Sequence, residues 1–589
     1  MSRVATATDT GISSDNPGAT SSELTAKRRG TVALLGETVD GDPLPRLRRR
    51  LTPPHYGSDV KWGWLAPLIV TLLAGVLHFW NISSPPKLTF DETYYAKDAY
   101  SLLVKQYAVE FVNDSETDEN EADEIINSGS TEGVFAEGDL PSKVVHPEVG
   151  KWMIAFGEWI FGMTALGWRF SAALTGTLMV LVMCRLVRRL TGSTLLGCVA
   201  GALLALDGLH FVMSRLALLD IFLTFWLLCA VQCLVADRDW ARSKLARLHE
   251  MSPVRSLDGF GDFGPVRGFL LRPWRLLAGV CFGLAAGTKW SAVFVLGGFG
   301  LLIWAWDSGM RRSVGVRWAP VKSLLVDAIP SFFSIVVVGL VVYVLSWASL
   351  LTHVDQFEDQ FAAATGGDDS RAWTSTDDNP GNPLEHAAHG LNVLWNYHHE
   401  VYAFHTGDYL KNVDPHPFQS HPGGWLVLNR PLGIAATSGD SSVVPECPEG
   451  ESCVKQVMAI GTPLLWWAGV IALVVGLGYW LTRRDWRFGV PVVGVLTTWL
   501  PWFQYADRQI FIFYAVSIVP FTVITVTLVL GKILGRSDST YSRRLTGLAV
   551  VAALVALVAI NFAYFYPILT NGLLSNAEWN DRMWLRYWI

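Results

Sequence analysis

The sequence has few charged residues for its length: Asp, Glu, Lys and Arg together make up 17% of its 589 residues. Soluble globular proteins carry about a quarter, so the composition argues against a soluble protein. Neither sign of charge dominates, because 46 basic and 52 acidic side chains leave a net charge of −6. That balance excludes the strongly basic surface that binds nucleic acid, and we predict no nucleic-acid partner.

Several catalytic and metal-binding motifs are also absent. There is no Gly-rich phosphate loop ending in Lys-Ser/Thr, no His-Glu-x-x-His motif and no pair of Cys-x-x-Cys motifs, which excludes P-loop chemistry and the common zinc sites. Residues 349–458 do contain several His residues, whose uneven spacing favours solvated or hydrogen-bonding roles: His386, His389, His398, His399, His405, His416 and His421. We therefore expect no metal and no other cofactor.

A cleavable signal peptide is missing as well, because about sixty polar residues precede the first apolar run. Residues 1–60 are rich in Thr, Ser, Gly and Pro and have no apolar periodicity, so we predict that they are disordered. Arg46, Arg48, Arg49 and Arg50 stand just before the first apolar run. Such a basic flank predicts a cytoplasmic N-terminus by the positive-inside rule.

Long apolar runs dominate the rest of the sequence, which is 51% hydrophobic and contains 26 Trp. Runs of about 17 to 25 residues predict an all-α polytopic membrane protein with about eleven transmembrane helices. The predicted spans start near Trp64, Trp168, Ser193, Leu216, Leu276, Trp290, Leu324, Ala459, Gly489, Ile510 and Leu545. Lys and Arg gather in alternate connections, as expected of cytoplasmic loops, and this supports the topology independently.

This topology divides the chain into four parts. After residues 1–60 comes an N-terminal membrane module, 61–348, which includes an outer loop at 81–167; a large outer loop, 349–458, and a C-terminal four-span region, 459–589, follow. Between Lys105 and Lys143 the first outer loop contains eleven acidic and no basic residues. Such a block predicts a solvated or disordered insert, and we assign it no role.

The cysteines fall into two groups. Five of the seven lie in apolar runs, where a thiol usually behaves as a small hydrophobic group: Cys184, Cys198, Cys229, Cys233 and Cys281. Cys447 and Cys453 instead share a polar segment of the large outer loop. Because the predicted topology places this loop outside the cytoplasm, we predict a disulfide between them.

The segment after the first predicted span carries the strongest candidate for chemistry. Thr89 followed by Glu92 fits a capping box at a helix start. Asp91, Tyr95 and Asp98 are spaced to share one face of that helix at the membrane surface. We predict Asp91 as the catalytic base, with Glu92 beside it in the catalytic segment.

A second group of candidates consists of cations on the predicted outer side, where Lys and Arg should be scarce. Their desolvation is costly without an anion, and together they fit a clamp around a phosphate. The candidates are Lys97, Lys151, Arg169, Arg215, Lys289 and Arg508. The alternative for each is a local ion pair, such as Arg215 with Asp220 or Asp207, or Arg508 with Asp507.

These motifs resemble the protein O-mannosyltransferase family of polyprenyl-phosphate-dependent (GT-C) glycosyltransferases. The resemblance rests on the order of Asp91-Glu92, His146-Pro147-x-x-Gly150-Lys151, Arg215-Leu216-x-x-Leu219-Asp220 and Gly287-Thr288-Lys289-Trp290, followed by Ser420–Trp425, Gly461–Trp467 and Arg508-x-x-Phe511-x-Phe513-Tyr514. Eukaryotic members of the family carry an appended β-trefoil module in the large outer loop. Residues 349–458 show no such module, so the sequence is similar to the bacterial branch. Glu148 stands where the family often has Pro.

The resemblance implies a GT-C fold with amphipathic helices in the first outer loop, and a bacterial plasma-membrane enzyme whose active site is on the outer face. It also implies inverting transfer of mannose from a polyprenyl-phosphate-mannose donor to Ser or Thr hydroxyls of exported proteins. Asp91 would act as base, and the lipid phosphate would be held by the cations above with Tyr95 and His146 as hydrogen-bond donors. Expected partners are the donor, the protein acceptors, the bilayer and the secretion translocon.

Two other functions are compatible with the sequence. One is a GT-C enzyme that glycosylates a lipid or a glycan, which an assay with a Ser/Thr peptide distinguishes from protein transfer. The other is a secondary transporter, in which Asp207 and Asp220 would be ion-coupling groups within the membrane. Transporters usually contain repeated halves with broken helices, and no such repeat is evident in the sequence.

Overall fold

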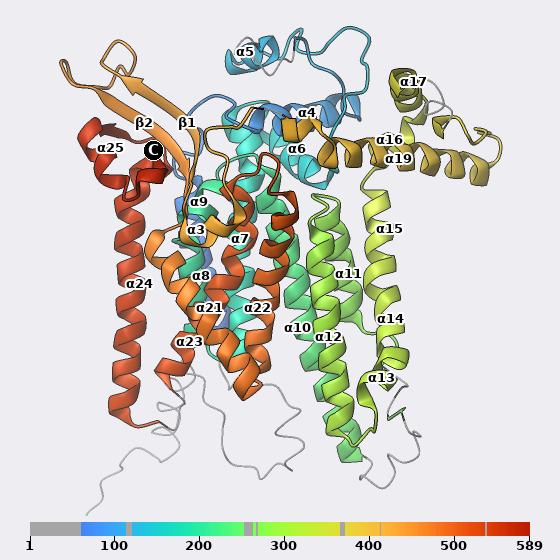
Figure 1. The fold of residues 1–589 in the computed structure, drawn as a ribbon, viewed down its shortest axis with the longest axis vertical. Helices are drawn as coiled ribbons and strands as arrows, with labels where there is room; N and C mark the ends of the chain where they lie inside the picture. The colour runs from blue at the N-terminus through green and yellow to red at the C-terminus, as the bar shows by residue number, and fades with distance from the viewer. Residues whose placement is uncertain are drawn as a thin grey trace, which may run out of the picture.

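The computed structural model describes residues 60–113, 120–251, 263–264, 266, 269–365, 372–412, 414–535 and 539–589. The predicted disordered segment and its basic flank lie outside these residues. The described chain forms a bundle of long helices, with shorter helices and a small sheet gathered at one end, the upper end in Figure 1. We call this the capped end.

The bundle is built from helices that match the predicted spans in order. They are α3 (Trp62–Phe79), α7 (Ala165–Thr191), α8 (Thr194–Ala205), α10 (Leu219–Met251), α11 (Pro273–Ala286), α12 (Ala292–Ser313), α13 (Ala319–Ser323), α14 (Ile329–Ser331), α15 (Val338–Leu345), α21 (Pro463–Arg483), α22 (Trp486–Trp499), α23 (Val519–Leu534) and α24 (Tyr541–Leu569). Two π-helical turns, Leu324–Ala328 and Phe332–Val337, join α13, α14 and α15 into one span.

The prediction of an all-α polytopic membrane protein is confirmed, whereas the number of spans is not. Seven helices among the described residues are long and apolar enough to cross a membrane. The third, fifth, ninth and tenth predicted spans fall on α8, α11, α22 and α23, which have 12, 14, 14 and 16 residues. A helix that crosses the hydrocarbon core alone needs about 20 residues, so these four are shorter than the pattern predicted.

Burial differs sharply between the spans. The apolar part of α10 is 78% buried, whereas that of the α13–α15 span is only 22% buried. The main core packs α10 against α11 and α7, and α7 against α8, with α23 beside α8. The centre of the bundle is therefore protein-packed, and the outer helices expose apolar side chains of the kind that faces lipid.

The capped end is formed by the connections that the sequence places outside. Its helices are α4 (Glu92–Lys105), α5 (Glu121–Asn127), α6 (Val149–Phe161), α9 (Gly208–Met213), α16 (Ala348–Thr352), α17 (Val354–Thr365), α19 (Pro383–Thr406), α20 (Tyr409–Asn412) and α25 (Asn576–Arg582). The 3₁₀ turns of the described chain are Pro422–Val427, Leu500–Tyr505, Ile512–Ser517 and Arg586–Trp588.

A three-stranded antiparallel sheet stands above the C-terminal helices (Figure 1). Its strands β1 (Leu432–Gly439), β2 (Cys453–Ala459) and β3 (Leu573–Ser575) are arranged in the order β1-β2-β3, with Ala436 opposite Gln456 and Lys455 opposite Leu573. The predicted disulfide between Cys447 and Cys453 is present and links the β1–β2 connection to the start of β2.

The described part of the acidic insert is solvated at Glu121, Glu124, Glu132 and Glu137, as its composition predicted, but it also packs against α4. Its helix α5 buries Ala122 and Ile126, and Asp123 forms an ion pair with the buried Lys97 of α4 at 2.9 Å. Thr93 of α4 also donates a hydrogen bond to Asp123, at 2.7 Å. The described part of the insert is therefore packed against α4 through a carboxylate that composition alone marked as solvent-exposed.

Candidate active site

Asp91 lies immediately before α4, at the end of a constrained turn. Phe90 adopts a φ of 53°, a left-handed conformation that is strained for a bulky side chain. Its ring packs edge-on against Phe511 and Phe513, at centroid distances of 5.7 Å each. The backbone N–H and hydroxyl of Thr89 both donate to Glu92. These contacts fix the direction in which the Asp91 side chain leaves the chain.

Glu92 is committed to a buried ion pair rather than to the site itself. Its carboxylate accepts two hydrogen bonds from Arg169, at 2.8 and 2.7 Å, and a third from the backbone N–H of Ala217 at 3.0 Å. Both charged side chains are fully buried. We therefore expect a positioning role for Glu92 in place of the predicted catalytic one.

Arg169 holds the chain that leads to Asp91. Its remaining N–H groups donate to the carbonyls of Ile82, Pro85 and Lys87, at 3.1, 2.9 and 3.0 Å. Because Arg169 is fully buried and its guanidinium is saturated by these groups and Glu92, it has no donor left for a lipid phosphate. We therefore expect a structural role for Arg169 in place of the predicted phosphate contact.

Three more of the predicted phosphate ligands are occupied by protein partners. Lys97 is paired with Asp123, and Lys151 with Asp98, both at 2.9 Å and with each lysine only 1% exposed. Arg215 donates to the backbone carbonyls at the end of α3, including those of His78 and Trp80. The sequence could not give these partners, because each lies far along the chain or within the acidic insert.

Two of the predicted phosphate ligands remain, Lys289 and Arg508, and the positive charge of Lys289 acts directly on Asp91. Lys289 Nζ lies 2.7 Å from Asp220 Oδ2 and 5.0 Å from the centre of the Tyr514 ring. Arg508 donates from Nη1 to His405 Nδ1 at 3.3 Å, while its Nε is buried without a partner. Among the described residues no carboxylate lies within ion-pair distance of Arg508.

An ion pair, the alternative to phosphate binding, is present for Lys97, Lys151, Arg169 and Lys289, but the specific pairs named for Arg215 and Arg508 are wrong. Asp220 pairs with Lys289 rather than Arg215. Asp207 caps α9 and accepts a hydrogen bond from Trp466 at 2.6 Å. Asp507 contacts Lys411 at 3.6 Å. The two aspartates invoked for a transporter therefore have structural partners.

Two histidines complete the cluster on the side of α6 and α19. The rings of His146 and His405 are stacked at a centroid distance of 5.2 Å, and Tyr95 lies 6.0 Å from His146. His405 Nε2 is 2.9 Å from the Val145 carbonyl, so it carries the proton and leaves Nδ1 to accept from Arg508. Burial lowers the pKa of His405 to about 4 and holds that of His146 well below its usual value, an effect to which Lys289 adds. Both rings are neutral.

The His146–Lys151 and Gly287–Trp290 motifs meet because α6 packs closely on the α11–α12 connection. The backbone N–H of Val149 donates to the Gly287 carbonyl at 2.9 Å. A Cβ on Gly150 would lie 2.7 Å from the Leu219 side chain and 3.1 Å from that of Thr288, so a larger residue would force these side chains to shift. The predicted residues Asp91, Tyr95, His146, Lys289 and Arg508 are thus brought together at the capped end.

Asp220, His405 and Tyr514 also belong to the cluster and were not predicted as site residues. Asp220 and Tyr514 lie in the motifs that carry the resemblance. The sequence therefore marked these two positions but did not indicate that they belong to the site. His405 was one of seven unevenly spaced His residues. Its contacts with Val145, His146 and Arg508, which come from distant parts of the chain, distinguish it from the others.

Asp91 differs from its neighbouring carboxylates in having no hydrogen-bond or ion-pair partner among the described side chains. Burial raises the pKa of its carboxyl to about 7; the positive charge of Lys289 acts against this rise and the negative charge of Asp220 adds to it. A carboxylate with a pKa near neutrality is suited to accept a proton from a hydroxyl during a reaction.

Comparison with known proteins identifies the family. A sequence model described as dolichyl-phosphate-mannose-protein mannosyltransferase matches residues 145–248, and one for the C-terminal four-transmembrane region of protein O-mannosyltransferases matches residues 391–588. A polyprenol-phosphate-mannose–protein mannosyltransferase of Mycolicibacterium smegmatis is 37% identical over 91% of this chain and 95% of its own length. The chain belongs to the protein O-mannosyltransferase family.

A second relative supports this assignment, and a solved structure supports the fold. The polyprenol-phosphate-mannose–protein mannosyltransferase of Mycobacterium tuberculosis is 36% identical over 94% of each chain. The protein O-mannosyltransferase Pmt1–Pmt2 complex of Saccharomyces cerevisiae, bound to its sugar donor, matches with a TM-score of 0.61 at 13% identity over 95% of this chain and 94% of that one. The structural match confirms the predicted GT-C fold, and the family makes this chain a glycosyltransferase.

Proposed function

We propose that this protein transfers mannose from a polyprenyl-phosphate-mannose donor to Ser or Thr hydroxyls of exported proteins, with Asp91 as the base. The names of its relatives give the donor and the acceptor class. The observation that carries the assignment of the base is that Asp91 alone, among the carboxylates Glu92, Asp98 and Asp220 around it, has no cation bonded to it in the described structure.

The proposed reaction is a single displacement that inverts the anomeric carbon. The acceptor oxygen attacks that carbon, its proton passes to Asp91, and the bond between the carbon and the phosphate oxygen breaks. The departing lipid phosphate takes the electron pair of that bond and gains a second negative charge, which Arg508 and Lys289 stabilise while Tyr95 and His146 donate hydrogen bonds. No protein-bound sugar forms, so one base is sufficient.

The assay that tests this function uses membranes containing the protein, radiolabelled β-linked polyprenyl-phosphate mannose and a Ser/Thr peptide. Transfer to the peptide, with label released by an α-mannosidase, is the expected result; label found only in lipid or glycan would assign the enzyme to the alternative acceptor class. A parallel reaction with EDTA should proceed at the same rate, because protein cations rather than a metal meet the phosphate.

We also propose that the capped end faces outward from a bacterial plasma membrane and that the N-terminus is cytoplasmic. Basic residues cluster at the opposite end, as at Arg188 and Arg189 in the last turn of α7, and Arg483 in that of α21. The disulfide at the capped end suits an oxidising compartment. An acceptor leaving the secretion translocon would meet this face, and co-purification with the translocon in mild detergent tests that association.

The rate of transfer is expected to depend on the protonation of Asp91. Because burial raises the pKa of Asp91 to about 7, the base is increasingly protonated below neutrality, and kcat/KM should fall by roughly tenfold for each pH unit below it. The Asp220→Asn variant removes a negative charge that raises this pKa, so its acid limb should shift to lower pH. An unshifted acid limb in that variant, or a flat profile in the unmodified enzyme, would remove Asp91 as the titrating group.

Donor affinity is expected to depend more on Arg508 than on Lys289. Arg508→Ala removes a cation without a carboxylate partner, and the loss of charge-assisted hydrogen bonds should weaken donor binding by roughly 10- to 100-fold. Lys289→Ala should weaken it less, because Asp220 already neutralises that ammonium. Arg508→Lys should recover part of the affinity, since an ammonium lacks the planar fork.

The matched control is Lys411→Ala, which removes a partly exposed cation at the same end of the bundle. It should leave donor affinity, measured by binding of the labelled lipid, unchanged. Equal donor affinity in Arg508→Ala and Lys411→Ala would show that Arg508 is structural.

A further inference from the structure

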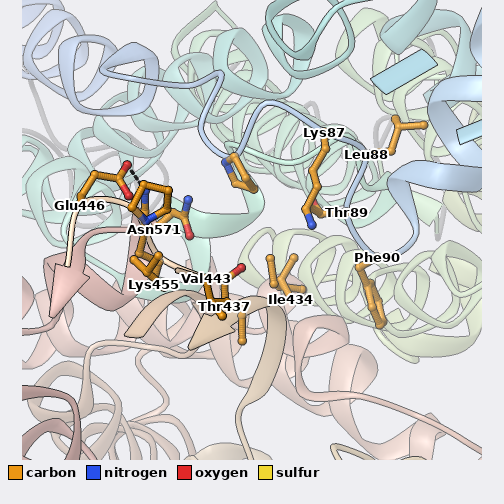
Figure 2. Close-up of a pocket in the computed structure, with 15 residues that line it drawn as sticks. Lys87, Leu88, Thr89, Phe90, Ile434, Thr437, Val443, Glu446, Lys455 and Asn571 are labelled. Carbon is orange, nitrogen blue, oxygen red and sulfur yellow. Dashed lines mark hydrogen bonds and ion pairs between the residues drawn. The ribbon is translucent and has the colours of Figure 1, made fainter. Parts of the chain in front are cut away.

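A groove of about 470 Å³ opens between the chain that leads into α4 and the three-stranded sheet. One wall is formed by Pro85 and 87–90, and the other by residues 434–437 of β1. Figure 2 shows these walls facing each other, with Phe90 at one end and Glu446 at the other. None of the residues proposed to bind the donor phosphate lines this groove.

We infer that this groove binds an extended segment of the acceptor polypeptide next to the reacting hydroxyl. The inference rests on the proposed function and adds a location to it. Phe90 lines one end of the groove and directly precedes Asp91, which lies outside the lining, so a chain lying in the groove would extend past Phe90 to meet the base. The volume is within the range of about 300–1,000 Å³ that ligand sites occupy.

The wall formed by β1 suits a polypeptide backbone. Ala435, Ala436 and Thr437 have small side chains, and the last two are exposed. In the described sheet β1 is an outer strand that pairs with β2 alone, so its second edge has backbone groups available to an extended peptide. Small side chains beside such an edge leave space for the side chains of the bound chain.

The remaining lining is too polar for the lipid tail of the donor. Lys87 is exposed on one wall, and Lys455 and Glu446 form an ion pair of 2.9 Å in the other. A polyprenyl chain would leave these charges without water, whereas peptide amides hydrogen-bond beside them. The groove therefore fits the protein substrate.

The groove wall and the base are held by the same buried side chain. Arg169 bonds the carbonyls of Pro85 and Lys87 and also the carboxylate of Glu92, which follows Asp91. A peptide that contacts this wall is thus placed at a fixed distance from the base. Because the groove wall and the base are held in a fixed arrangement, binding of a flexible peptide in the groove also positions its Ser or Thr hydroxyl for reaction.

Filling the groove tests the inference. Ala436→Trp places a large ring at an exposed lining position, and it should raise the KM for a Ser/Thr peptide by about 10-fold or more, a factor of ten corresponding to about 1.4 kcal/mol. Donor affinity should stay unchanged. The control, Leu573→Trp, adds the same ring at a 40% exposed position of the same sheet outside the groove, and should leave the peptide KM unaltered.

A second measurement does not depend on turnover. A photo-crosslinking amino acid in place of Thr437 should capture a labelled Ser/Thr peptide, and one in place of Leu573 should not. Equal capture at both positions, or an equal peptide KM in the two Trp variants, would overturn the groove as acceptor site. Failure of the unmodified protein to mannosylate any peptide would instead overturn the proposed function, and crosslinking at Thr437 would still report whether the groove binds peptide.

Discussion

Replacing Asp91 by Asn is expected to reduce transfer by about 10²- to 10⁴-fold, the contribution of general-base catalysis. The amide preserves the shape of the side chain but cannot take the proton of the acceptor hydroxyl. Because the donor-binding cations are unchanged, the variant should still bind polyprenyl-phosphate mannose. Single-turnover transfer and binding of the labelled donor, measured on the same preparation, separate the two effects.

The conservative change Asp98→Asn is the matched control for this experiment. Asp98 lies on the same helix and pairs with the buried Lys151, so its loss should lower stability and leave the chemical step of the folded fraction intact. If Asp91→Asn turns over at a near-normal rate in well-folded protein, the proton must go to another group and the proposed mechanism is wrong.

The second large effect is expected from the buried pair of Arg169 and Glu92, and it is an effect on folding. Arg169→Met removes one partner and leaves the carboxylate of Glu92 buried without its counter-ion, which typically costs about 3–5 kcal/mol. Thermal unfolding of the purified protein in detergent should show a much lower Tm.

The double variant Arg169→Met with Glu92→Gln distinguishes a structural pair from a phosphate ligand. Removing both charges should cost less than the sum of the two single changes, because no unpaired charge remains. A normal Tm for Arg169→Met combined with weak donor binding would restore the original prediction that Arg169 contacts the donor.

The sequence predicted the architecture well because hydrophobic length and the placement of Lys and Arg are local properties. Each predicted span falls on a helix, and the family motifs fall at one end of the bundle. Prediction of span length is less accurate for helices that are buried by neighbouring helices. For example, α8 has only 12 residues, because an apolar run indicates burial but does not show whether lipid or protein surrounds it.

The candidate site was predicted only in part, because the pairing of charges depends on contacts between distant segments. Asp91 and Arg508 have no ion-pair partner among the described residues, so both stay available for the predicted roles. Arg169 does not, since it is paired with Glu92, which lies 77 residues away. Sequence proximity also paired Arg215 with the wrong aspartate, because a guanidinium can be satisfied by backbone carbonyls that no residue pattern reveals.

The contact between Lys97 and the acidic insert has an evolutionary consequence. Asp123 neutralises a lysine that is only 1% exposed. The insert and the lysine should therefore be gained or lost together during evolution. A relative that loses the insert must also replace Lys97 with a neutral residue or acquire another carboxylate near it. We therefore expect Lys97 and Asp123 to covary among homologues. If the insert alone is transplanted into a chain without this lysine, Asp123 should have no counter-ion on α4, the helix that begins directly after Asp91.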